Sequence, residues 1–187
     1  MSKHLHGKLF FLLGTVTAVI FGGCLQEEIS TDNIPPVEHF QLERYMGRWY
    51  EIARLPHPFE EDVSDAQAEY TLRPDGQITV LNSGFRNQIP VSADGIARSV
   101  SEDGMGVMEV SFFRPFYGLY KIIYLDKDYQ LAIVTSSTMD YVWILARHPL
   151  ISRQELNKCL TMLKQWGYAV NLLQYPSGMV QELAREN

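Results

Sequence analysis

The stretch that decides the fold is FQLERYMGRWYEIAR, which spans residues 40–54. Its second half predicts a β-strand near residues 48–55, and Gly47 stands directly before that strand. A glycine at the start of a strand permits a tight turn where a side chain would collide or where φ must be unusual. Two residues later, Trp49 adds a large indole ring that is stabilised by burial. Gly-x-Trp alone is a weak signal, so the rest of the chain has to support it.

Turn-forming residues follow this stretch at intervals of roughly 7 to 13 residues, and they separate short runs rich in Val, Ile, Tyr, Phe and Thr. We therefore expect eight strands, near residues 48–55, 67–73, 77–86, 95–101, 106–113, 118–126, 129–137 and 141–147. The predicted fold is all-β, an eight-stranded antiparallel up-and-down β-barrel, because the connections are of hairpin length and a closed barrel leaves no sheet edge exposed.

One helix follows the last predicted strand. Ser152 and Glu155 form the S-x-x-E pattern of a capping box, which predicts where the helix begins. Apolar residues then recur at helical spacing over Arg153–Trp166, and Gly167 is placed to end the helix. Residues 169–175 are expected to add a short ninth strand beside this C-terminal helix.

The amino terminus predicts a secretory signal peptide over residues 1–23. Its first eight residues carry two lysines and no acid. The uncharged run Leu9–Phe21 that follows has 13 residues, whereas about 20 apolar residues are needed to cross a bilayer. This segment therefore resembles an export signal more than a membrane anchor.

Gly22 and Gly23 end on Cys24, an arrangement that resembles a bacterial lipoprotein signal, in which the cysteine after the cleavage point receives the lipid. Leu25, rather than an aspartate, follows the cysteine, and this resembles a signal for export to the outer membrane. The polar residues 24–36 are expected to form a lipidated tether, and residues 37–187 the folded domain. The alternative is a plain signal peptide with an incidental cysteine.

Composition narrows the class of protein. The 187 residues allow one domain with a sizeable core. Sixteen Lys+Arg against 22 Asp+Glu give a net charge of −6 without a basic block, which argues against nucleic acid as a partner. Two cysteines, Cys24 and Cys159, are too few for a disulfide framework.

Three blocks, in this order and spacing, resemble the lipocalin family: Gly47-x-Trp49, the turn Met139–Tyr141 before VWIL, and Arg147 at the end of that strand. Two longer stretches, VSFFRPFYGLY and DYVWILAR, are similar to the bacterial outer-membrane members of the family. The resemblance covers residues 40 to about 175.

The resemblance implies structural roles for five residues. Gly47 and Trp49 would close one end of the barrel, and Arg147 would lie across the Trp49 ring in a cation–π contact of about 0.5–2 kcal/mol. Asp140 and Tyr141 would form the matching turn at the same end.

The resemblance also implies a lipid ligand, either a fatty acid or a lysophospholipid. Tyr117 and Trp143 are the matching aromatic residues, and Tyr141 shares a strand face with Trp143. Arg114 and Lys121, together with Tyr117, are candidates to bind a polar head group near the mouth. From the residues alone, the alternative is that Tyr117 and Trp143 pack within a filled barrel.

These implications predict a lipoprotein of a Gram-negative bacterium, lipid-anchored on the periplasmic face of the outer membrane. It would store or transport a fatty acid or lysophospholipid, serve envelope maintenance under stress, and need neither a cofactor nor a catalytic step. Its partners would be the lipid and the membrane, and the resemblance leaves a homodimer open. The long loop 55–65 is a candidate lid.

Two alternatives stay open. In one, the barrel is a lipid-modifying enzyme, because Glu51 shares a strand face with Trp49 and a buried carboxyl there would hold its proton more tightly and serve as an acid. In the other, the protein is a structural component of the envelope whose barrel is filled by its own side chains.

Metal and nucleophile chemistry is not expected. His39, His57 and His148 are isolated in the sequence, without the spacing of a metal site, and are interpreted as solvated loop histidines. Cys159 falls on the apolar stripe of the predicted helix, which favours buried packing over a reactive thiol.

Overall fold

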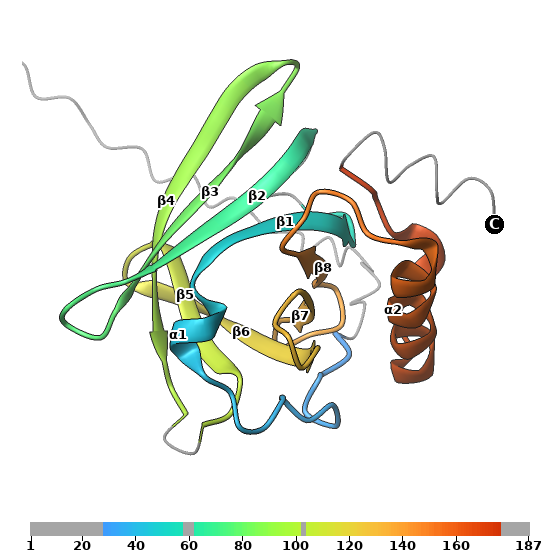
Figure 1. Ribbon diagram of the computed structural model, residues 1–187, viewed down its shortest axis with the longest axis horizontal. Helices are drawn as coiled ribbons and strands as arrows, with labels where there is room; N and C mark the ends of the chain where they lie inside the picture. The colour runs from blue at the N-terminus through green and yellow to red at the C-terminus, as the bar shows by residue number, and fades with distance from the viewer. Residues whose placement is uncertain (1–27, 58–61, 102–103, 177–187) are drawn as a thin grey trace, which may run out of the picture.

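The computed structural model describes residues 28–57, 62–101 and 104–176. These residues form one closed barrel in which each strand pairs with the next and β8 returns to β1 (Figure 1). The elements are α1 (Leu42–Tyr45), β1 (Gly47–Arg54), β2 (Val63–Leu72), β3 (Ile78–Arg86), β4 (Ile89–Ser99), β5 (Val107–Phe113), β6 (Phe116–Leu125), β7 (Leu131–Thr135), β8 (Val142–Ala146), α2 (Arg153–Trp166) and the 3-10 helix η2 (Val170–Leu172). The predicted eight-stranded antiparallel barrel is confirmed.

The up-and-down path gives the barrel two different ends. One end carries α1, the start of β1 and the β2–β3, β4–β5 and β6–β7 connections, and we call it the closed end. The other end, which we call the open end, carries the β1–β2, β3–β4, β5–β6 and β7–β8 connections.

Strand β8 is apolar on both faces because each face is covered. Val142, Ile144 and Ala146 pack in the core between the barrel wall and α2. Trp143 and Leu145 belong instead to the core inside the barrel. A strand covered on both faces reads as a continuous apolar run rather than a strict alternation, which is why VWIL gives no clear period in the sequence.

Helix α2 begins and ends where the sequence predicts. Ser152 accepts a hydrogen bond from the backbone N–H of Glu155, and the Glu155 carboxylate accepts one from the backbone N–H of Ser152, so the capping box is formed. Gly167 has a φ of 90°, a left-handed conformation that favours glycine at a helix end. The buried face of α2 packs on the outer wall of the barrel, beside β8 (Figure 1).

The predicted ninth strand is wrong. Residues 170–172 form η2, and a single β-bridge follows, in which Arg54 and Gln174 exchange backbone hydrogen bonds of 3.0 and 2.8 Å. The barrel already pairs every strand on both sides. The end of β1, beyond its last β2 partner at Tyr50, receives this segment in one bridge, and the start of β2 adds a single hydrogen bond from the Asp65 N–H to the Pro176 carbonyl at 3.2 Å.

The tether predicted for residues 24–36 is bound to the barrel from Ser30 onward. Ser30 forms a β-bridge with Thr138, and the Thr31 hydroxyl donates to the Ser136 carbonyl at 2.7 Å. Ile34 is buried in the core on the outer wall. A freely extended spacer would therefore end before Ser30. The predicted signal peptide and Cys24 lie outside the described residues.

All of the barrel, α2 and the two cores lie within residues 28–176, so a chain that starts at residue 28 contains the complete domain. Among the described residues, none of the helices has both the length and the apolar character needed to cross a lipid bilayer.

Candidate functional site

The closed end is sealed by Trp49. Its side chain is fully buried, and its indole N–H donates to the Tyr45 carbonyl at 2.8 Å. The Arg147 guanidinium lies over the indole ring, 4.0 Å from its centre. Gly47 has a φ of 89°, and a Cβ atom added there would lie 3.5 Å from the Arg147 guanidinium. That distance is an ordinary van der Waals contact, so the glycine is required by the positive φ of the turn rather than by the approach of the arginine.

Arg147 ties three chain segments together across this end. It donates to the carbonyls of Arg44 and Arg48 at 2.8 Å each, and to the carbonyl of Tyr129 at 3.2 Å. The Arg44 guanidinium in turn lies 4.0 Å from the centre of the Tyr129 ring. These contacts join α1, β1 and the β6–β7 connection, and they close the base of the barrel.

Three tyrosine hydroxyls form a polar floor inside the barrel, above Trp49. The hydroxyls of Tyr45 and Tyr120 are 2.7 Å apart, and the Tyr70 hydroxyl donates to Tyr120 at 3.1 Å. Burial raises the pKa of Tyr45 and that of Tyr120 well above the ordinary value for tyrosine. The floor therefore stays uncharged at neutral pH, and its hydroxyls are already engaged with one another.

A β-bulge places an ion pair on the inner face of β1. The β1–β8 register shifts between Glu51 and Ala53, so Glu51 lies opposite Leu145 and Arg54 opposite Trp143. Both partners on β8 belong to the interior core, and both β1 side chains therefore face inward.

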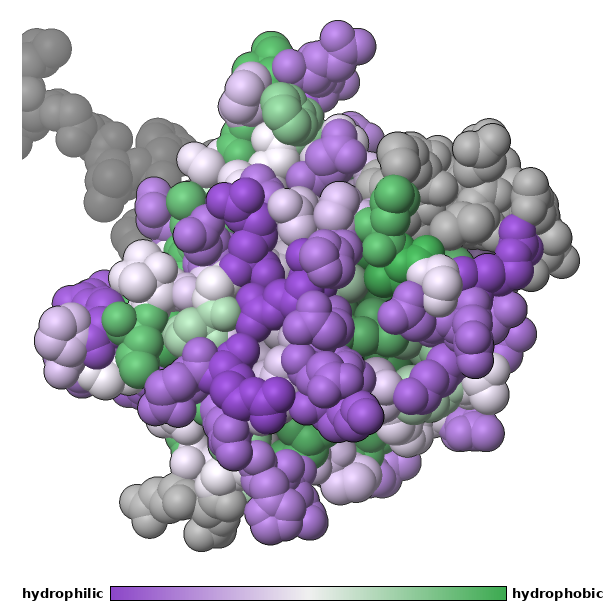
Figure 2. Space-filling model, in the orientation of Figure 1, coloured by the Kyte–Doolittle hydropathy of each residue, from purple (hydrophilic) through white to green (hydrophobic). Residues whose placement is uncertain are grey.

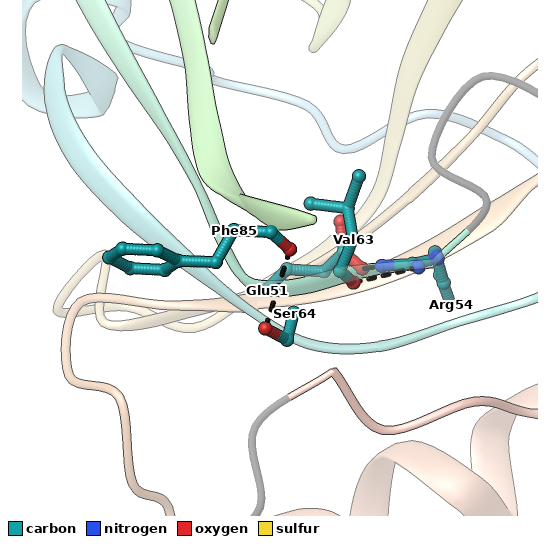
Figure 3. Close-up of polar contacts among 5 residues, drawn as sticks. All are labelled: Glu51, Arg54, Val63, Ser64 and Phe85. Carbon is teal, nitrogen blue, oxygen red and sulfur yellow. Dashed lines mark hydrogen bonds and ion pairs between the residues drawn. The ribbon is translucent and has the colours of Figure 1, made fainter. Parts of the chain in front are cut away.

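Glu51 and Arg54 are almost completely buried and are 2.5 Å apart (Figure 3). The second guanidinium nitrogen of Arg54 donates to the Val63 carbonyl at 3.1 Å. An arginine beside a carboxylate favours the ionised carboxylate. The enzymatic alternative assumed an isolated buried carboxyl at Glu51, whereas this carboxylate is paired with Arg54.

Three rings gather next to this pair, at the open end. The ring centres of His57 and Trp143 are 5.2 Å apart in an edge-on arrangement, and those of Tyr141 and Trp143 are 6.2 Å apart and stacked. His57 is only 8% exposed, so its interpretation as a solvated loop histidine is wrong. No pattern in the sequence indicates this burial, because the predicted strand ends at Leu55.

The upper part of the interior is reached by solvent. Met108, Ile122 and Trp49 face inward and are fully buried. Val110 and Trp143 also belong to the interior core but keep part of their surface exposed. Since the wall is closed all round, this exposed apolar area faces the inside of the barrel toward the open end.

A family model described as a lipocalin-like domain matches residues 40–177. The chain belongs to the lipocalin family. The resemblance drawn from the Gly47 and Arg147 blocks is therefore confirmed.

The chain is also similar to two relatives in sequence and to one solved structure in fold. It is 40% identical over 161 residues to the outer membrane lipoprotein Blc of Vibrio cholerae, a match that covers 84% of this chain and 92% of that protein. It is 34% identical to the outer membrane lipoprotein Blc of Escherichia coli K12, with 88% and 94% covered. The structure of insecticyanin from the tobacco hornworm Manduca sexta superposes with a TM-score of 0.63 at 19% identity and covers 80% and 89%, which shows the shared fold.

The prediction that Asp140 and Tyr141 form a turn at the closed end of the barrel is wrong. Asp140 and Tyr141 precede β8 in the β7–β8 connection, which lies at the open end. At the closed end stands a second Asp-Tyr pair, Asp128–Tyr129, whose tyrosine carbonyl receives the hydrogen bond from Arg147. Both pairs look alike in the sequence, and only the alternating chain direction separates them.

The predicted ligand residues separate into inner and outer groups. Trp143 and Tyr141 come together at the open end. Tyr117 does not join them. Tyr120 faces the interior, and Tyr117, three residues earlier in β6, lies on the opposite face, the outer wall. There the Arg98 guanidinium lies 4.5 Å from the centre of the Tyr117 ring. Its predicted place in the cavity is wrong. The sequence shows that side chains of β6 alternate between two faces, but it does not show which face is the inner one.

The two predicted cations also lie away from the interior. Lys121 faces outward and donates to the Thr31 carbonyl at 2.6 Å, so it binds the amino-terminal segment instead of a head group. Arg114 is exposed at the end of the β5–β6 hairpin. The cation that faces inward beside Trp143 is Arg54, which the sequence analysis missed because the bulge at Ile52 changes which residues of β1 face inward.

Two further expectations concern reactive groups. Burial raises the pKa of the Cys159 thiol to about 12. Across residues 28–57, 62–101 and 104–176, no group of three or more His, Cys, Asp and Glu side chains is placed to hold a metal ion. The candidate lid includes residues 58–61, which lie outside the described residues.

Proposed function

We propose that this lipocalin is a lipid-anchored outer-membrane lipoprotein that binds an amphiphilic lipid in the upper half of its barrel. The observation that carries the proposal is the solvent-reached apolar interior beside Val110 and Trp143, above a base sealed by Trp49. Each methylene of an acyl chain buried there contributes about 0.8 kcal/mol before the entropy cost of binding. The protein stores or carries the lipid by reversible capture.

The anchor and the location form part of the same proposal. Cys24 carries the lipid, and the domain lies on the periplasmic face of the outer membrane. The support is the Gly22-Gly23-Cys24 sequence and the likeness to two proteins named outer membrane lipoprotein. A protein that binds free fatty acids or lysophospholipids at the outer membrane would serve to maintain the envelope under stress.

The buried ion pair favours a zwitterionic head group. Arg54 and Glu51 lie next to Trp143 and present opposite charges to the same part of the interior. A phosphoethanolamine head group has a phosphate for the guanidinium and an ammonium for the carboxylate, whereas a fatty acid has an anion only. We therefore place lysophosphatidylethanolamine ahead of a free fatty acid as the ligand.

Tryptophan fluorescence tests this function directly. Residues 28–187 are titrated with lysophosphatidylethanolamine and, separately, with a fatty acid of equal chain length. We expect saturable binding of both, tighter for the lysophospholipid. Trp143→Ala should weaken binding, whereas Trp166→Phe, which packs between α2 and the outside of the barrel wall, should leave it unchanged. The function is wrong if neither lipid gives a saturable change and native mass spectrometry finds no bound lipid.

The head-group assignment has its own test. Arg54→Gln should weaken lysophospholipid binding by about 10- to 100-fold, the range for a lost hydrogen bond to a charged group. The double variant Glu51→Gln with Arg54→Gln removes both buried charges together and controls for the instability that a single unpaired charge would cause. Equal affinity of this double variant and the wild type for the lysophospholipid would contradict the assignment.

A further inference from the structure

Large hydrophobic side chains are exposed at the end of the β5–β6 hairpin. Phe113 and Phe116 are each 77% exposed, although they pair across the two strands and stand next to one another. Arg114 lies between them in the sequence and is exposed as well. Contact of such large apolar side chains with water is unfavourable. Phe113 and Phe116 are the most exposed aromatic residues of the described chain.

The β3–β4 hairpin carries a second group of the same composition. Phe85 is 42% exposed and Ile89 65%, and Arg86 follows the phenylalanine just as Arg114 follows Phe113. In the described residues β5 pairs with β4 only at Ile96–Ser99, so the hairpin end projects beyond the neighbouring wall (Figure 1). Hydrophobic atoms are visible on this projecting end at the top of Figure 2.

The ends of both hairpins lack acidic residues, and the first acids are met farther along the strands, at Asp94 in β4 and Glu109 in β5. Residues 77–93 and 110–125 contain no Asp or Glu, although the whole chain has a net charge of −6. The other two connections at the open end do contain acids, among them Asp62 and Asp140. The apolar and basic character is thus confined to one side of the mouth.

We propose that the ends of the β3–β4 and β5–β6 hairpins dock this protein onto a phospholipid bilayer that contains anionic lipids. Phe113 and Phe116 enter the boundary between head groups and acyl chains, and Arg114 binds lipid phosphate. Aromatic rings beside arginine suit this boundary, because the ring is buried while the guanidinium stays among the head groups.

A bilayer fits this surface better than a protein partner does. The exposed side chains stand on two convex hairpin ends rather than in a groove, and a fluid membrane surface needs no matching pocket. Their positive charge is opposite to that of anionic lipids, whereas a second copy of this chain would bring a net charge of −6. Docking in this way holds the mouth of the barrel against the membrane, so a lipid passes between the two without crossing water.

Vesicle flotation tests the docking surface. Residues 28–187, which lack Cys24 and the apolar run before it, are mixed with vesicles of phosphatidylethanolamine and phosphatidylglycerol. We expect the wild type to float with the vesicles. The double variant Phe113→Ser with Phe116→Ser should bind about 10- to 100-fold more weakly, as expected for two aromatic rings that are no longer buried.

Two matched variants sharpen the result. Arg114→Gln should weaken binding about fivefold on these vesicles and less on pure phosphatidylcholine vesicles, because the net negative charge of the anionic lipids strengthens the contact of the guanidinium with lipid phosphate. Leu150→Ser removes an exposed apolar residue that follows β8, away from the two hairpins, and should bind like the wild type.

Three results would overturn the proposal: a wild type that does not float, a double variant that floats like the wild type, and a loss with Leu150→Ser that equals that of the double variant. A wild-type dimer in sedimentation that the double variant abolishes would assign the surface to a second copy instead. The proposal is independent of the bound ligand, since the double variant should still bind lysophospholipid in detergent-free solution with unchanged affinity.

Discussion

At the closed end of the barrel Trp49 and Tyr45 are fully buried, whereas at the open end Phe113 and Phe116 are 77% exposed and Trp143 is half-buried. Both ends use aromatic rings and arginine. At the closed end Arg147 makes a cation–π contact and three hydrogen bonds to carbonyls. At the open end the rings keep apolar surface in contact with solvent. The comparison indicates that one end stabilises the fold and that the other keeps unsatisfied surface for binding.

The largest expected effect is at the closed end. Trp49→Ala should lower the free energy of unfolding by about 3–5 kcal/mol, because it removes a fully buried indole and leaves a cavity under Arg147. Urea denaturation measures this loss. Trp143→Ala is the matched control at the open end, and it should cost only about 1 kcal/mol since its ring is half-buried. Equal losses for both variants would contradict the division between the two ends.

The tyrosine floor should make the closed end sensitive to alkali. The pKa of Tyr45 is raised in the folded state, so above pH 10 the unfolded chain loses the proton and the folded chain keeps it. Stability is therefore complete below pH 10 and falls above it, by about 1.4 kcal/mol per pH unit for Tyr45, with Tyr120 acting in the same direction.

Denaturation curves recorded between pH 8 and pH 11.5 check this slope. Tyr45→Phe should reduce the slope, and Tyr117→Phe, on the outer wall, should leave it as in the wild type. A slope that Tyr45→Phe does not change would show that the floor is not the titrating group.

At the open end the expected effect is on binding. Trp143→Ala should weaken lysophospholipid binding about tenfold, as expected from the loss of roughly 1.4 kcal/mol of apolar contact. Isothermal titration calorimetry measures the change. Leu145 lies on the same inner face, two residues nearer the closed end, and is buried, so Leu145→Ala should lower stability more than affinity. A larger loss of affinity with Leu145→Ala than with Trp143→Ala would contradict this, because the ligand would then lie deeper in the barrel.

The smallest effect concerns the thiol. Cys159 lies on the buried face of α2 and its pKa is raised to about 12, so in the domain from residue 28 it should react with a thiol reagent at pH 8 only after unfolding. Absorbance of the released reporter follows this reaction with and without urea. Rapid modification of the folded protein would show that α2 opens from the barrel.

Elements whose signals are local could be predicted from the sequence. The capping box of Ser152 and Glu155 fixed the start of α2, and the spacing of turns gave all eight strands. Position in three dimensions could not be predicted in the same way. The bulge at Ile52 turns Arg54 inward, and no feature of the sequence WYEIAR predicts this bulge.

The same limit explains the errors at the candidate site. Asp128–Tyr129 and Asp140–Tyr141 are the same dipeptide, and only the direction of the chain decides which one meets Arg147. Tyr117 alternates correctly with its neighbours but lies on the outer face. A period of two gives the two faces of a strand and not which of them is the inside.

The central claim is that an acyl chain lies in the upper half of the barrel, above the floor of tyrosines. A crystal structure with a fatty acid that carries bromine at the end of its chain tests it most directly, through the anomalous signal of the bromine. We expect one strong peak inside the barrel, between Trp143 and the hydroxyl of Tyr120. A barrel interior filled by side chains, with bromine found only on the outer surface, would contradict it.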